Sequence, residues 1–323
     1  MKKINQLVLI CLCFVSHSFS QTPTVKASET YKVKLQTGIV YGQGLSHTSI
    51  NSKDATELDL LLDAYVPEND VKNRPAIVLI HGGGFLGGSR ATKSFKFIGN
   101  YFASRGWVVF SIDYRLGKHK GTVPEKWNMF VENRQDLNQK RKTQVLAIYP
   151  ALRDAKAALR WVAANADTYH INTDYITVGG GSAGAFTAIG VGISKEDAFK
   201  TEISTEVDPT LKSTHLEQTF KVRNIVDYWG GMAPIELHQG VFGTEHMDKT
   251  APPILIVHGT EDPTVKFSEA KKLKKAYTTV GVPFELIALE GMGHGVWNAT
   301  VEGKNLSELT YDYLTEQQAL NVE

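Results

Sequence analysis

Short apolar runs alternate along the chain with longer segments in which apolar residues recur every three or four positions. Continuous apolar runs of this kind are typical of strands buried on both faces of a parallel sheet. They occupy residues 75–80, 107–112, 175–178, 222–229, 253–258 and 284–289. Helices are predicted between and after these runs, at about residues 92–105, 150–166, 183–193, 266–279 and 306–320. The alternation predicts an α/β fold with one twisted, mostly parallel sheet and helices on both faces.

Other segments fit around this sheet. Alternating or β-rich apolar patterns at 33–41 and 58–66 predict an early pair of strands. Residues 116–149 are rich in charged and amide side chains and are expected to form an irregular insert or small lid. The helix after this insert is predicted to begin at Pro150, because proline is favoured in the first turn of a helix.

The domain organisation follows from the same survey. The sequence contains no internal repeat and no Pro- or Ser-rich linker. Residues 31–323 are therefore expected to form a single domain, preceded by a polar and disordered stretch at 21–30. With 323 residues and 42% hydrophobic content, the chain is long enough to bury one large core.

The first twenty residues have the pattern of a secretory signal peptide. Lys2 and Lys3 precede an apolar run at 7–15 that is too short to span a bilayer, and small residues then lead to Ser20. Cleavage after Ser20 would remove both cysteines of the chain. We therefore expect an exported protein, periplasmic or extracellular, with no membrane anchor after cleavage.

Charge narrows the class of partner. The formal net charge is +1 and no long run of one sign occurs, so neither nucleic acid nor an anionic membrane is an expected partner. The histidines show no spacing typical of metal ligands, and we expect no metal and no organic cofactor.

Ser182 lies where the apolar run 175–178 gives way to a segment of small residues. With Gly180 and Gly184 it matches the G-x-S-x-G pattern, in which a sharp strand-to-helix turn exposes a nucleophilic serine. Small neighbours let the strand and the helix pass each other at such a bend. A plain glycine-rich turn has the same pattern, so the interpretation depends on the rest of the chain.

Three more elements follow predicted strands, at the sheet edge where open α/β proteins bind ligands. Residues 81–84, His-Gly-Gly-Gly, match the H-G-G-G motif that directs backbone N–H groups at a carbonyl oxygen. Asp262 follows the run 253–258, with Glu261 as its rival, and His294 lies in a glycine-rich loop after the last strand. The order Ser, Asp, His along the chain is that of α/β-hydrolases.

Together these motifs resemble the α/β-hydrolase fold, and within it the carboxylesterase/lipase group with an H-G-G-G motif, the hormone-sensitive-lipase-like and acetylesterase-like branch. The segments 113–115, Asp-Tyr-Arg, and 154–161 also resemble that group. The resemblance implies Ser182 as nucleophile, Asp262 as orienting acid and His294 as base. It implies oxyanion donors from the backbone of Gly83, Gly84 and Ala183.

Aromatic and sulfur-containing residues flank these motifs and are candidates for lining a substrate pocket, although such residues commonly belong to a core. They are Phe85, Trp229, Met232 and Trp297. Asp113 and Arg115 are expected to form a structural ion pair.

The leading functional interpretation is an exported serine carboxylic-ester hydrolase. The charged insert at 116–149 presents no broad apolar face, which favours short acyl groups, acetyl or feruloyl, on a small or saccharide-linked alcohol. A serine exopeptidase on the same fold and a non-catalytic binding protein on the same fold remain as alternatives.

Overall fold

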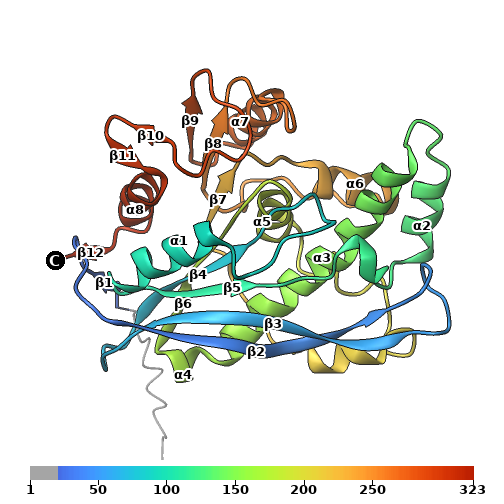
Figure 1. Cartoon of the computed structure of the whole chain (residues 1–323), viewed down its shortest axis with the longest axis horizontal. Helices are drawn as coiled ribbons and strands as arrows, with labels where there is room; N and C mark the ends of the chain where they lie inside the picture. Colours follow the sequence, from blue (N-terminus) through green and yellow to red (C-terminus); the bar gives the residue numbers. More distant parts are fainter. Residues whose placement is uncertain (1–20) are drawn as a thin grey trace, which may run out of the picture.

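The structure is a computed structural model that describes residues 21–323, so the signal-peptide prediction for residues 1–20 lies outside the described residues. Its centre is an eight-stranded sheet in the order β2-β3-β5-β4-β6-β7-β8-β9 (Figure 1). The strands of this sheet are β2 (Val33–Ser46), β3 (Thr56–Pro67), β4 (Arg74–Ile80), β5 (Val108–Ile112), β6 (Ile171–Gly181), β7 (Asn224–Tyr228), β8 (Ile254–Gly259) and β9 (Phe284–Leu289). The pair β2–β3 and the contact of β3 with β5 are antiparallel, and every later contact is parallel.

The central strands are buried on both faces. Every residue of β4, β5, β7 and β8 is buried, as expected for strands covered by helices on either side. In β8, Ile254 and Ile256 belong to one core cluster, and Leu255 and Val257 belong to the other. The alternation of the strand thus supplies both cores, and the expected α/β-hydrolase architecture is present.

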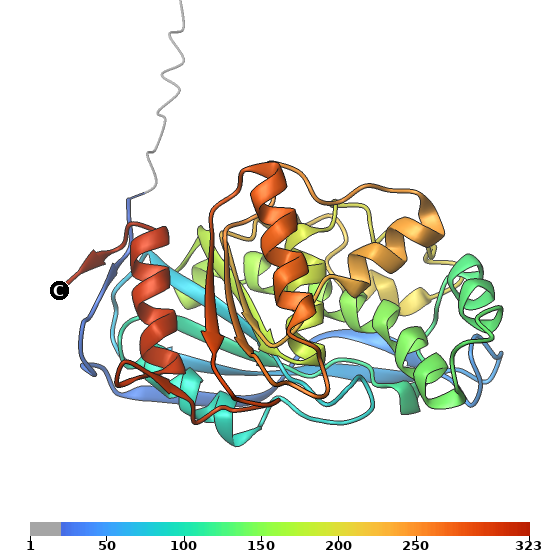
Figure 2. The same ribbon diagram turned by 90° about the horizontal axis from the view of Figure 1, so that it is seen from above.

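Helices cover the two faces unequally. Helices α1 and α8 pack on one face, and α3, α5 and α7 on the other (Figure 2). The helices are α1 (Lys93–Ala103), α2 (Glu125–Glu132), α3 (Gln139–Ala164), α4 (Ala166–Tyr169), α5 (Ala183–Ile193), α6 (Ala233–Phe242), α7 (Ser268–Val280) and α8 (Leu306–Gln317), with short 3₁₀ turns η1 (Gly117–His119) and η2 (Pro209–Ser213). Within residues 21–323, no helix is both long and apolar enough to cross a bilayer.

The insert at 116–149 is not irregular, which corrects the expectation from the sequence. It contains η1, α2 and the first third of α3, and α3 begins at Gln139 rather than at Pro150. The side chain of Asn138 caps this helix by accepting the N–H of Arg141 at 3.0 Å. Trp127 of α2 is fully buried and donates to the carbonyl of Val145 at 3.1 Å. Capping and packing therefore extend the helix across the proline.

Residues 21–30 also differ from the expected disorder. Short strand β1 (Thr24–Val25) pairs in parallel with β12 (Asn321–Val322). The N–H of Lys26 donates to the carbonyl of Arg105 at 2.9 Å. Main-chain hydrogen bonds with distant segments order this polar stretch, and sequence composition carries no signal for such bonds. A second small sheet joins β10 (Thr300–Val301) to β11 (Lys304–Asn305).

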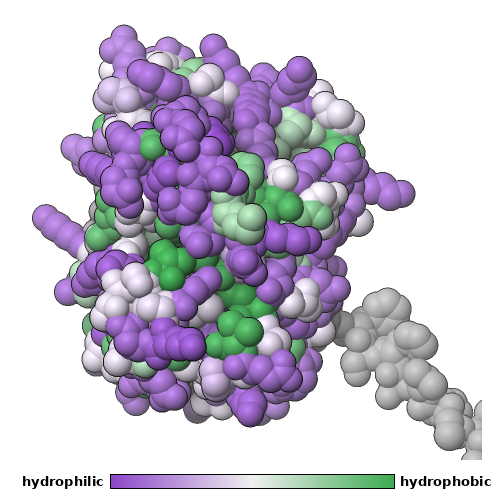
Figure 3. Space-filling model, turned by 90° about the vertical axis from the view of Figure 1, so that its right-hand side faces the viewer, coloured by the Kyte–Doolittle hydropathy of each residue, from purple (hydrophilic) through white to green (hydrophobic). Residues whose placement is uncertain are grey.

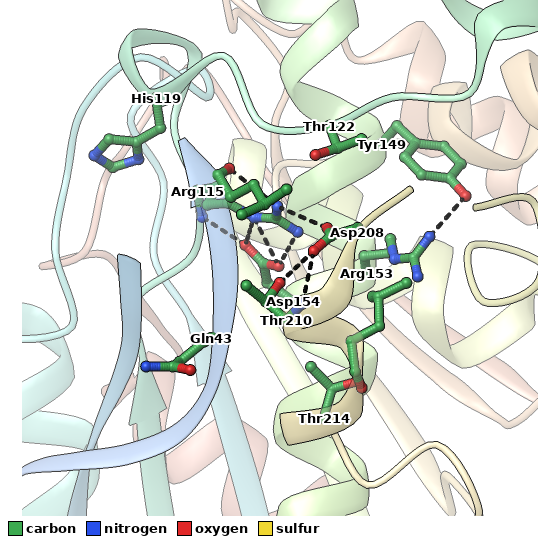
Figure 4. A network of polar contacts seen from close by, with 12 residues as sticks. Gln43, Arg115, His119, Thr122, Tyr149, Arg153, Asp154, Asp208, Thr210 and Thr214 are labelled. Carbon is green, nitrogen blue, oxygen red and sulfur yellow. Dashed lines mark hydrogen bonds and ion pairs between the residues drawn. The ribbon is translucent and has the colours of Figure 1, made fainter. Parts of the chain in front are cut away.

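Asp113 and Arg115 do not pair with each other. Asp113 forms an ion pair with Arg90, whereas Arg115 binds Asp154 of α3, with 2.7 Å between Nη2 and Oδ1 (Figure 4). Asp154 accepts from both the side chain and the backbone N–H of Arg115. A second carboxylate, Asp208, lies 3.9 Å from Nη1 of Arg115. A buried guanidinium thus fastens the chain after β5 to α3.

Candidate active site

Ser182 occupies the sharp corner between β6 and α5. Its backbone has φ +54° and ψ −123°, a conformation that residues other than glycine rarely adopt. A Cβ atom on Gly184 would lie 1.8 Å from the carbonyl oxygen of Ile80, and one on Gly180 would lie 2.3 Å from the same oxygen. Both glycines of the motif are therefore required by the close approach of β4 to the corner.

The structure brings the three predicted triad residues together. Nε2 of His294 lies 2.9 Å from Oγ of Ser182, and Nδ1 of His294 lies 2.6 Å from Oδ2 of Asp262. Oδ1 of Asp262 accepts the backbone N–H groups of Thr264 at 2.8 Å and Val265 at 2.9 Å. The carboxylate is thus held in place, and it accepts a hydrogen bond from Nδ1–H of His294 while Nε2 faces the serine.

Glu261, the rival acid, does not reach the histidine. It is exposed, and its carboxylate has no hydrogen-bond or ion-pair partner within the described part of the chain. His258, which sequence reasoning did not single out, supports Asp262 instead. It is fully buried, its Nε2 donates to the carbonyl of Val265 at 2.8 Å, and it lies 3.6 Å from Asp262. Burial lowers the pKa of His258, which favours a neutral ring beside the acid.

The three proposed oxyanion donors surround the serine. The turn after β4 has positive φ at Gly83 (+115°) and Gly84 (+60°). It abuts the corner, since a Cβ on Gly82 would lie 3.3 Å from Cβ of Ser182. Ala183 is the first residue of α5, where backbone N–H groups have no partner in the helix. Within residues 21–323, none of the N–H groups of Gly83, Gly84 and Ala183 has an acceptor. They are free to bind a developing oxyanion.

Two side chains that were not predicted as site residues hold the turn at residues 81–84, which we call the oxyanion turn. Nε2 of Gln144, on the first part of α3, donates to the carbonyl of Gly84 at 2.9 Å. The hydroxyl of Tyr114 donates to the carbonyl of His81 at 2.9 Å, and its ring stacks on the His81 ring at 4.3 Å. Sequence reasoning missed Gln144 because no local pattern marks it; only the course of α3 brings it to this turn.

A cavity of about 460 Å³ opens at Ser182 between α3, α5, α6 and α7. Its apolar lining comes from Phe85, Val145, Ile148, Phe186, Ala233, Leu237 and Val265. Its charged lining comes from Arg141, Glu236, Lys266, Glu269 and Lys272. Figure 3 shows the side of the molecule that carries α2 and α6, where apolar side chains form small patches between hydrophilic ones. The cavity is therefore amphipathic, and no broad apolar surface is visible on that side.

Of the four predicted pocket residues, only Phe85 lines this cavity. Trp229 and Trp297 pack against each other, with 4.8 Å between ring centroids, and the Trp229 ring lies 6.3 Å from that of His294. Met232 is buried in the core just before α6. A Cβ on Gly181 would lie 2.5 Å from Trp297, so the residue before the serine must be small. The two tryptophans thus pack beside His294 and do not line the cavity.

Residues 21–323 contain no group of three or more His, Cys, Asp or Glu side chains that could hold a metal ion.

Known families match this chain over most of its length. The profile of the prolyl oligopeptidase family matches residues 93–320, and that of the carboxylesterase family matches residues 18–119. The chain belongs to the prolyl oligopeptidase family. The match to this family spans the Ser182 corner, Asp262 and His294, while the carboxylesterase match spans the oxyanion turn. Both matches agree with the α/β-hydrolase carboxylesterase expected from the sequence.

Esterases are prominent among the relatives of this prolyl oligopeptidase family member. Esterase LipC of Mycobacterium tuberculosis is 25% identical over 73% of this chain and 56% of its own length. Gut esterase 1 of Caenorhabditis briggsae is 31% identical over 39% of this chain and 19% of its own length. This chain thus spans about half, or less, of the curated relatives named here.

Solved structures give the same result. A propionate-bound esterase 2 of Thermogutta terrifontis is 25% identical, with a TM-score of 0.58 over 89% of this chain and 94% of that one. The same enzyme phosphorylated by paraoxon has a TM-score of 0.58 over 88% of this chain and 94% of that one, at 25% identity. The expected α/β-hydrolase fold is confirmed, and the similarities support a serine carboxylesterase.

Proposed function

We propose that the protein is a serine carboxylesterase that hydrolyses short-acyl esters, acetyl or feruloyl, of a small or saccharide-linked alcohol. The observation that carries the proposal is the continuous chain Ser182–His294–Asp262, with 2.9 Å and 2.6 Å between the partner atoms. A serine hydroxyl becomes an effective nucleophile only when a base accepts its proton, and this chain supplies that base.

The reaction follows from the positions of these groups. Oγ of Ser182 attacks the ester carbonyl while its proton passes to Nε2 of His294, and the carbonyl π electrons move to the oxygen. The N–H groups of Gly83, Gly84 and Ala183 stabilise that oxyanion, and loss of one such donor typically costs about 3 kcal/mol. Collapse expels the alcohol, which takes the proton from His294. Water then repeats the cycle on the acyl-enzyme and releases the acid.

Short acyl groups are supported by the shape and chemistry of the cavity. The cavity has a volume of about 460 Å³ and is lined by both apolar and charged residues. A long acyl chain would need a continuous apolar tunnel, and a lipase working at a lipid surface usually needs a broad apolar lid. The related Thermogutta terrifontis esterase 2 binds propionate and butyrate in its solved structures. Short acids are therefore the expected products here.

The saccharide and the cellular location are further parts of the proposal. Charged side chains at the cavity suit an alcohol with several hydroxyl groups better than an alkyl chain. The signal-peptide pattern of residues 1–20 would deliver the enzyme to the periplasm or the medium, where ester-substituted polysaccharides are accessible.

A peptidase is the second candidate, and the family match over residues 93–320 favours it, since the same triad cleaves amides. A direct activity screen of residues 21–323 decides between the two. The substrates are p-nitrophenyl acetate, butyrate, octanoate and palmitate, acetylated xylo-oligosaccharide, methyl ferulate, and aminoacyl and prolyl p-nitroanilides.

We expect kcat/KM to be highest for acetate or butyrate, with acetate or ferulate released from the natural-type esters. A maximum at octanoate or longer would overturn the short-acyl proposal. Hydrolysis of the anilides at rates above those of the esters would establish the peptidase instead. Turnover of p-nitrophenyl acetate without acid release from the saccharide or ferulate esters would overturn only the proposed alcohol.

A further inference from the structure

Glu269 differs from the other charged residues of the catalytic cavity. Glu236 is neutralised by Lys272, with 2.6 Å between the charged atoms. Glu269 is half-buried in the same cavity, and its carboxylate has no hydrogen-bond or ion-pair partner among the residues that the structure describes. A carboxylate that is partly withdrawn from water is unfavourable unless donors satisfy it. A ligand that supplies such donors would be bound here.

Glu269 lies close to an aromatic ring that lines the same cavity. It lies in the first turn of α7, and its Oε2 is 2.9 Å from the point where a Cβ on Gly231 would stand. Cε1 of Phe186 is also 2.9 Å from that point. Even one methyl group at residue 231 would clash with both side chains, so the carboxylate and the ring pack closely against the Gly231 backbone and lie near each other.

This pair of side chains is close to the nucleophile. Phe186 lies one helical turn after Ser182 in α5, and its N–H donates to the Ser182 carbonyl at 3.0 Å. Both residues line the same cavity as Glu269. A group bonded to the reacting ester oxygen could therefore reach the carboxylate while the carbonyl carbon is at Ser182.

The surrounding charges favour a neutral group with hydroxyl donors. Arg141 and Lys266 line the cavity without a carboxylate partner among residues 21–323. These cations oppose the binding of a second positive charge beside Glu269. A hydroxyl group can donate to the carboxylate without that repulsion, and the C–H face of a sugar ring can pack on Phe186.

We propose that Glu269 binds a hydroxyl group of the alcohol portion of the substrate, with Phe186 packed against its ring, so that the site selects acyl esters of polyhydroxylated alcohols. The inference rests on the proposed esterase function and names the residue that sets its alcohol specificity.

The test compares two acetyl esters in wild type and Glu269→Gln. One is mono-acetylated methyl xyloside, which has free hydroxyl groups, and the other is phenyl acetate, which has none. Loss of a hydrogen bond to a charged group should lower kcat/KM for the xyloside, relative to kcat/KM for phenyl acetate, about tenfold. The change should come mainly from a higher KM for the xyloside. Glu261→Gln is the control, and it should change that ratio by less than about twofold because this exposed carboxylate does not line the cavity.

The outcomes separate the inference from the function on which it rests. An unchanged ratio, or an equal loss for both esters with an unchanged melting temperature, would overturn the role of Glu269 while leaving the esterase intact. A larger loss for acetylcholine than for the xyloside would show that Glu269 binds a cation and would overturn the hydroxyl assignment. If wild type hydrolyses no ester and a fluorophosphonate does not label Ser182, the proposed function itself fails.

Discussion

The strictest test of the site is Asp262→Asn, because the structure predicts how the amide would sit. Oδ1 of Asp262 accepts two backbone N–H groups, from Thr264 and Val265. The Asn oxygen would keep these two bonds, since turning the amide over would place its NH₂ against two donors. Its NH₂ group must then face Nδ1 of His294, where the carboxylate oxygen now lies at 2.6 Å.

The consequence is a change of tautomer. A donor opposite Nδ1 forces that nitrogen to accept, so the proton of the neutral ring moves to Nε2, which faces Oγ of Ser182 at 2.9 Å. A protonated Nε2 cannot take the serine proton. Loss of this carboxylate in a serine triad typically lowers turnover about 10⁴-fold, equivalent to about 5 kcal/mol in the activation barrier.

The assay is the initial rate of p-nitrophenyl acetate hydrolysis at saturating substrate, with folding checked by circular dichroism melting. The matched control is Glu261→Gln on the neighbouring exposed carboxylate, which should retain at least about half of the wild-type rate. Asp262→Asn should retain the fold, because its backbone hydrogen bonds persist. More than about 1% residual turnover in Asp262→Asn, or a deeper loss in Glu261→Gln, would refute the assignment of the acid.

Three further predictions concern the nucleophile and two buried carboxylates. Ser182→Ala should abolish ester hydrolysis and fluorophosphonate labelling with an unchanged melting temperature; persistent labelling would place the nucleophile elsewhere. Burial raises the pKa of Asp227 to about 7, so the folded protein binds this proton more tightly than the unfolded chain does, and its contribution to stability is lost as the pH rises from about 4 to about 7. Asp227→Asn should therefore gain stability relative to wild type across that interval, by up to about 4 kcal/mol in urea unfolding at pH 8, and a constant difference at all pH values would contradict the shifted pKa. Asp154→Asn should cost about 3–5 kcal/mol because it strands the buried Arg115, whereas Asp208→Asn should cost less than about 1 kcal/mol; equal shifts in melting temperature would show that the two carboxylates share the charge evenly.

The parts of the fold and site that were predictable from sequence are those with local causes. The close contact with Ile80 requires glycine at 180 and 184, so the sharp corner at Ser182 can be recognised from a short sequence motif. The buried strands were visible because a strand covered on both faces must be apolar throughout. Because Ser182, Asp262 and His294 each follow one of those strands, their meeting at one edge of the sheet was predictable.

The rest depends on tertiary contacts that no short pattern encodes. Pro150 was expected to start a helix, yet a cap at Asn138 and the packing of Trp127 carry the helix through it. Gln144 reaches the oxyanion turn only because that helix continues past the site. Arg115 has an acid two residues away in sequence but binds one that a different element presents.

Pro150 lies between a part of α3 that lines the cavity and a part that is buried throughout. Proline has no N–H, so the carbonyl of Leu146 lacks its usual helical donor. After Pro150, every residue from 151 to 162 is buried. Before it, Gln144, Val145 and Ile148 line the cavity. Arg141 and Val145 line the cavity without belonging to the buried core, so a focused library at these two positions should change substrate preference while leaving the buried part of α3 intact.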